Sequence, residues 1–100
     1  MYLSPTEEDR LRIFAAAELA RTVLARGMRL NAPEATALAC DEMHLAARSG
    51  ADYDEILQAG RAALDPSHLM EGVTDLVSEI RLEVLMDEGT RLVVLRGPTA

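Results

Sequence analysis

The stretch LARGMRLNAPEATAL, residues 24–38, contains the end of one helix and the start of the next. Gly27 is the residue type that most often follows the last turn of a helix. Asn31 can cap a second helix, because Pro33 then falls in the first turn and Glu34 lies where a carboxylate completes a capping box. The stretch therefore predicts a tight bend that joins two helices.

Capping patterns on either side of this bend predict further helices. Ser4 and Glu7 form one potential capping box, and Asp52 and Glu55 form another with the same spacing. Asp65 stands before a proline and can cap a short last helix. The predicted helices are 5–26, 32–48, 53–64 and 66–71.

The first two predicted helices differ in how their apolar residues are spread. In 5–26, the apolar face consists of Ile13, Ala16, Ala17, Ala20, Val23 and Leu24. Leu11, Phe14 and Leu19 lie off that face, so we expect this helix to have apolar surface on more than one side. In 32–48, the apolar stripe consists of Ala35, Leu38, Ala39, Met43 and Ala46. Glu42 lies inside that stripe, and the pattern gives no reason for it.

The apolar period changes in the last quarter of the chain. Residues 80–86 and 91–96 alternate or run apolar as strands do, and the turn residues 87–90 separate them. Two strands alone are barely stable in water, so the hairpin must pack on the helices or on another chain. We predict an α+β fold in one domain, residues 1–100: four mostly antiparallel helices, then a C-terminal two-stranded antiparallel β-hairpin.

Composition excludes several classes of protein. The net charge is −7, which disfavours nucleic acid and anionic membrane as partners because both need dense positive charge. All ten basic residues are arginine, a pattern that fits either coding bias or ion pairing at an interface. The sequence contains one cysteine, no signal-peptide pattern and no apolar run long enough to span a membrane. We therefore expect a cytoplasmic protein.

The chemically reactive residues do not form a recognisable catalytic or metal site. Cys40 and His44 are four residues apart on one helix and supply at most two metal ligands, and we expect both to be exposed. Ser67 and His68 lack the spacing of a catalytic triad. Carboxylates are abundant, and most of them stand at helix starts, where capping and the helix dipole explain them. They are Glu7, Glu8, Asp9, Asp41, Glu42, Asp52, Asp54 and Glu55. We predict no catalytic, cofactor-binding or metal-binding residue in this chain.

Helices followed by a hairpin also occur in winged-helix DNA-binding proteins. The third helix would then enter the major groove and would need basic or amide side chains. Here that helix carries Asp54, Glu55, Gln58 and a single arginine, and the hairpin turn is acidic. DNA binding is therefore a remote alternative.

Taken together, the motifs of the chain resemble the urease gamma subunit along essentially its whole length. Each motif is weak alone, but their order and spacing are specific. The residues that carry the resemblance are Arg26, Gly27, Leu30, Asn31, Pro33, Glu34, Met70, Glu71, Gly72, Gly89 and Thr90.

The resemblance implies a non-catalytic structural subunit of a nickel-dependent urease. In that family the nickel and the catalytic residues belong to the alpha subunit, and the gamma chain packs with alpha and beta subunits in a trimer of αβγ units. The chain departs from the family pattern at Glu42, Leu45, Thr74, the turn at Asp87 and Arg96. The alternative is a diverged interaction module outside an active urease.

Overall fold

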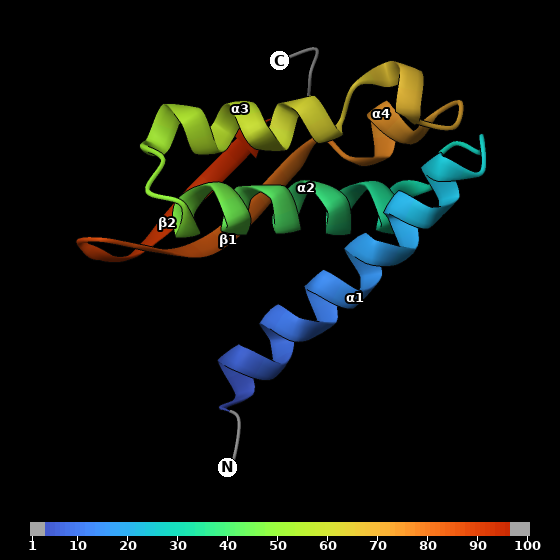
Figure 1. The fold of residues 1–100 in the computed structure, drawn as a ribbon. Helices are drawn as coiled ribbons and strands as arrows, with labels where there is room; N and C mark the ends of the chain where they lie inside the picture. The colour runs from blue at the N-terminus through green and yellow to red at the C-terminus, as the bar shows by residue number, and fades with distance from the viewer. Residues whose placement is uncertain (1–3, 97–100) are drawn as a thin grey trace.

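The computed structural model describes residues 4–96, and the two ends of the predicted domain, residues 1–3 and 97–100, lie outside that range. Within it the chain forms an α+β fold, as predicted: helices first, then a two-stranded antiparallel hairpin (Figure 1). The elements are α1 (Pro5–Ala25), α2 (Ala32–Arg48), α3 (Tyr53–Ala63), a 3₁₀ turn η1 (Pro66–His68), α4 (Val73–Leu76), β1 (Glu79–Met86) and β2 (Gly89–Arg96). No helix within residues 4–96 is long and apolar enough to cross a membrane.

The connector between α1 and α2 forms the predicted bend. Gly27 has a φ of +79°, and its N–H donates to the carbonyl of Leu24 while the N–H of Met28 donates to that of Val23. This pair of bonds is the Schellman motif, which uses the last carbonyls of a helix and favours glycine at the left-handed position. The chain therefore leaves α1 in a defined direction.

All three long helices begin with the capping boxes that the sequence predicts. At α2, the Asn31 side chain accepts from the Glu34 N–H at 2.9 Å, and the Glu34 carboxylate accepts from the Asn31 N–H at 3.0 Å. The same reciprocal pair joins Ser4 to Glu7 at α1 and Asp52 to Glu55 at α3. The carboxylates of these residues are thus used to start helices.

Helix α2 is the centre of the molecule, because α1, α3 and β1 all pack against it (Figure 1). Its buried side chains consequently point in almost every direction around the helix axis. They are Ala35, Leu38, Ala39, Cys40, Asp41, Met43 and Ala47. A single apolar stripe, as the sequence suggested, does not describe a helix that is covered on several sides.

The prediction of a helix over 66–71 is wrong about its length. The structure has a 3₁₀ turn that ends at His68, and Leu69 is extended because its segment pairs with the α1–α2 connector. The N–H of Leu30 donates to the His68 carbonyl at 2.8 Å, and the Met70 N–H donates to the Leu30 carbonyl at 2.9 Å. Gly72, expected to end that helix, instead has a φ of +85° and precedes α4.

The hairpin packs one face on α2 and α3 through Ile80, Val84, Val93 and Leu95, which are buried. Its strands begin earlier than predicted, at Glu79 and Gly89, so the turn contains only Asp87 and Glu88. The register pairs Met86 with Gly89 next to the turn and Glu79 with Arg96 at the far end.

Helix α1 has apolar surface on two sides, as predicted. Ala17 and Ala20 are buried against α2, with Ile13, Val23 and Leu24 partly buried beside them. Ala16, expected on the buried face, is exposed. Leu11, Phe14 and Leu19 are 52%, 43% and 57% exposed, and we call these three residues the outer stripe of α1.

Candidate interaction surface

Most of the motif residues lie together at one end of the molecule, and two of them lie at the opposite end. Leu30 is completely buried and joins the connector, with Arg26, Gly27 and Asn31, to the segment around Met70. Pro33 and Glu34 lie in the first turn of α2, and Glu71 and Gly72 are exposed just after Met70. Gly89 and Thr90 lie at the hairpin turn, at the opposite end of the molecule (Figure 1).

A cluster of ion pairs between α1 and α2 was not predicted. Asp41 is completely buried, and its two carboxylate oxygens accept from Arg10 and Arg21, each at 2.6 Å. Arg21 also donates to Glu42 at 2.8 Å and to Glu18. Burial lowers the pKa of Arg21, but its hydrogen bonds to the carboxylates raise that pKa above its ordinary value.

This cluster explains two features of the sequence. Glu42 interrupts the apolar stripe because it faces Arg21 across the α1–α2 interface. Asp41 stands in the middle of α2, so the capping that explains most of the other carboxylates does not apply to it. The missing signal was the pairing of two helix faces: neither helix alone shows that Arg10 and Arg21 point at one carboxylate.

The expectation that Cys40 and His44 are exposed is wrong. Cys40 is 7% exposed and His44 is half-buried, because α2 is covered on several sides. Burial, with the nearby charge of Asp41, raises the pKa of the Cys40 thiol to about 11. Burial and the charge of Arg10 lower the pKa of His44. A cysteine binds a metal ion as its thiolate. An environment that raises the pKa of the Cys40 thiol therefore disfavours Cys40 as a metal ligand.

Ser67 and His68 are not arranged as a nucleophile and its base. The Ser67 hydroxyl donates to the Asp65 carboxylate at 2.8 Å, and the Ser67 N–H donates to the same oxygen at 2.9 Å. These bonds lower the pKa of Asp65. Nδ1 of His68 is buried and has no hydrogen-bond partner among residues 4–96. The Ser67 hydroxyl is thus bonded to Asp65, the residue that caps the start of η1, and is not paired with His68.

Metal-binding side chains do not gather elsewhere in the described part of the chain. Within residues 4–96 there is no group of three His, Cys, Asp or Glu side chains that could hold one metal ion. The acidic residues at the α2–α3 connector and the hairpin turn border a shallow hollow, which also contains Arg91. Arg91 lies over the Tyr53 ring, 4.5 Å from its centroid, and supplies a positive charge there.

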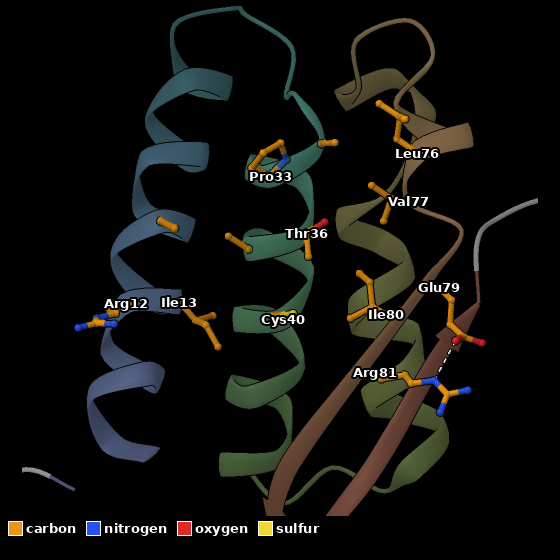
Figure 2. Close-up of a pocket in the computed structure, with 13 residues that line it drawn as sticks. Arg12, Ile13, Pro33, Thr36, Cys40, Leu76, Val77, Glu79, Ile80 and Arg81 are labelled. Carbon is orange, nitrogen blue, oxygen red and sulfur yellow. Dashed lines mark hydrogen bonds and ion pairs between the residues drawn. The ribbon is translucent and has the colours of Figure 1, made fainter. Parts of the chain in front are cut away.

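The larger hollow is an open groove of about 690 Å³ between α1, α2 and the start of β1 (Figure 2). Small side chains of α2, namely Thr36, Ala37 and Cys40, form its floor. Ile13 and Arg12 line the α1 side, and Glu79, Ile80 and Arg81 line the β1 side. The polar groups are at the rim and do not converge on a point where a small substrate would react.

Large apolar side chains are exposed on two further surfaces. One is the outer stripe of α1. The other is the sheet face turned away from the helices, where Leu85 and Leu92 are 72% and 50% exposed. Exposed apolar patches of this kind mark sites of protein contact. The geometry therefore fits an interaction protein better than a small self-contained enzyme.

Comparison with known proteins identifies the family of the chain. The family model described as "Urease, gamma subunit" matches residues 1–99. A urease subunit gamma of Frankia alni is 44% identical over 100 residues, which cover the whole of both chains. A urease subunit gamma of Saccharopolyspora erythraea is 40% identical over 98 residues, 98% of each chain.

A longer relative, urease subunit gamma/beta of Streptomyces avermitilis, is 51% identical over 98 residues. The match covers 98% of this chain but 43% of that relative, so the chain spans less than half the length of this protein. A similar gamma/beta protein of Streptomyces coelicolor is 49% identical over the same share of both chains.

Proposed function

Because this chain belongs to the urease gamma-subunit family, we propose that it is a non-catalytic structural subunit of a urease. The observation that carries the proposal is the outer stripe of α1. Its three large side chains are exposed on a helix whose other face is already buried against α2. A helix with a second apolar face has a second packing partner, and within residues 4–96 no element covers that face.

The partners that we propose are the alpha and beta subunits of urease, in a trimer of αβγ units in the cytoplasm. Urea would be hydrolysed to ammonia and carbon dioxide in the alpha subunit, where nickel would be bound. The donor groups of residues 4–96 support that division of labour, since Cys40 is buried with a raised thiol pKa and no group of three metal-binding side chains is present among these residues. The side chains of this part of the chain do not fit a nickel site.

The proposed mechanism is packing. The outer stripe of α1 and the exposed sheet face would be buried against the larger subunits, while the bridge between Leu30 and Leu69 holds the α1–α2 connector against the segment that precedes α4. Burial of apolar surface is the main favourable term in such association. The gamma chain would thus stabilise the oligomer without touching the substrate.

Coexpression with the neighbouring reading frames tests this proposal. We expect the chain to co-purify with a large nickel-containing subunit, and the native complex to have the mass of a multiple of αβγ. The complex should hydrolyse urea and the purified chain alone should not. If the chain never co-purifies with a nickel-binding subunit, the urease role is wrong, and stable capture of an unrelated partner would favour the diverged module.

A further inference from the structure

One contact shows which residue pairs of the hairpin are hydrogen-bonded to each other and which are not. The N–H of Val94 donates to the Tyr53 hydroxyl at 3.4 Å, so this N–H points away from β1. In an antiparallel pair, hydrogen-bonded and non-hydrogen-bonded residue pairs alternate. Arg81 pairs with Val94 and is therefore in a non-hydrogen-bonded pair, as are the pairs containing Glu83 and Leu85.

It follows that β1 has a free edge. The N–H and C=O groups of Arg81, Glu83 and Leu85 point away from β2, and no other backbone group among residues 4–96 bonds to them. Unpaired groups in a row are the template for addition of another strand. On β2, by contrast, Tyr53 occupies part of the corresponding edge.

The groove borders the start of this edge, where Arg81 lines it together with Glu79 and Ile80 (Figure 2). Arg81 and its neighbours form one side, α1 forms the other, and the floor is the small-residue surface of α2 around Thr36, Ala37 and Cys40. A strand next to β1 would lie about 4.8 Å from it and would cover α2 as β1 does. Small floor residues leave room for the side chains of such a strand.

We propose that the groove is a slot for one extended strand of a partner polypeptide, which adds to β1 as a third strand. Alternate apolar side chains of that strand would face the α2 floor. A carboxylate on its outward side would meet Arg12 at the α1 rim, while Arg81 at the β1 rim already donates to Glu79 at 2.9 Å. The slot admits a single strand, because α1 closes the side opposite β1.

The partner to which we commit is the beta-type urease polypeptide, so this inference rests on the proposed function. Two relatives carry the gamma and beta names in one chain. In such a joined chain the two parts are tethered, and tethering raises the effective concentration of one part at the surface of the other.

Hydrogen exchange of the native complex tests strand addition directly. In the isolated chain the amides of Arg81, Glu83 and Leu85 should exchange quickly, while those of Leu82 and Val84, which bond to β2, should be protected. In the complex we expect Arg81 and Glu83 to become protected. A photoreactive phenylalanine analogue in place of Thr36 should crosslink to the beta-type polypeptide.

Edge prolines give a matched pair of variants. Glu83→Pro removes an outward N–H from the free edge of β1, and Thr90→Pro removes one from β2 at the neighbouring non-hydrogen-bonded pair. Each is compared with the alanine variant at its own position, so that loss of the side chain is subtracted. We expect Glu83→Pro to weaken assembly about tenfold, the effect of losing one or two hydrogen bonds, and Thr90→Pro to change it less than about twofold.

The possible outcomes separate the slot from the urease role. If the complex forms but Arg81 and Glu83 exchange as in the isolated chain, the slot is wrong and the urease role stands. Equal effects of the two proline variants would likewise overturn strand addition, and a crosslink to the alpha subunit would overturn the choice of partner. If no complex with urease subunits forms, both proposals are wrong.

Discussion

At the scale of single residues, the packing of α1 depends on Asp41. Its carboxylate is completely buried and accepts from Arg10 and Arg21, and both guanidinium groups remain partly exposed. A buried charge is tolerated only when it is paired, and removing one partner leaves the other groups uncompensated. The alanine-rich face of α1 supplies few large contacts, so this cluster sets the position of α1 on α2.

We expect Asp41→Ala to lower the free energy of unfolding by about 2–4 kcal/mol, measured by urea denaturation. The two arginines would have to turn to solvent, and a small cavity would replace the carboxylate. Glu18→Ala is the matched control, because this carboxylate meets the same Arg21 at the exposed surface and should cost less than about 1 kcal/mol. Equal losses for the two variants would show that the buried cluster has no special weight.

Cys40 makes stability depend on pH in the alkaline range. Folding raises the pKa of its thiol from about 9 to about 11, so below pH 9 the thiol is neutral in both states. Between pH 9 and 11 the unfolded state loses its proton while the folded state keeps it, and stability falls as the pH rises. We expect the parent to lose about 1–3 kcal/mol more than Cys40→Ala over this range in urea denaturation. Parallel pH profiles for the two proteins would contradict the prediction.

At the scale of elements, local patterns were enough wherever neighbouring residues determine the structure. The boxes at Ser4, Asn31 and Asp52 and the bend at Gly27 depend on residues three or four positions apart, and all four are present. The hairpin was also visible, because alternation and an acidic turn with glycine are local signals.

The errors came from contacts between distant segments. Leu69 is extended because it pairs with Leu30, thirty-nine positions earlier, and the helix expected over 66–71 therefore stops at His68. Cys40 is buried because α2 has neighbours on several sides, which a single-helix pattern does not show. For the same reason the ion-pair cluster and the slot beside β1 were out of reach of sequence patterns: both need two or more elements placed together.

The contact between α3 and its neighbours depends on Gly60. A Cβ at this position would lie 2.8 Å from the Met43 sulfur and 2.8 Å from Cδ2 of Leu95, both in the core. Gly60→Ala should therefore destabilise the protein by about 1–2 kcal/mol, although alanine is the better helix former. Gln58→Ala, on the exposed side of α3, should leave the melting temperature almost unchanged. A Gly60→Ala protein as stable as the parent would mean that α3 can move away at little cost.

At the scale of the whole molecule, the paired charged groups and the exposed apolar side chains lie in different places. Charged groups between α1 and α2 are used inside the molecule, where Asp41 and Glu42 meet arginines. The outer stripe of α1 and the exposed leucines of the sheet have no such partners among residues 4–96. A chain that pairs its buried carboxylate internally and exposes several large apolar side chains has the distribution expected of a subunit, whose core is completed by its neighbours.

The outer stripe of α1 offers the sharpest test of that distribution. Leu11→Glu combined with Leu19→Glu should leave the unfolding free energy of the isolated chain within about 0.5 kcal/mol, since both side chains are exposed and glutamate is a good helix former. The same double variant should fail to co-purify with the urease subunits, because two charges would be buried in an apolar interface without partners. Leu45→Glu is the control: Leu45 is 43% exposed on α2 and is not part of the outer stripe of α1, so assembly should persist. If the double variant assembles as well as Leu45→Glu does, the stripe faces solvent in the complex and the interface lies on another surface of the chain.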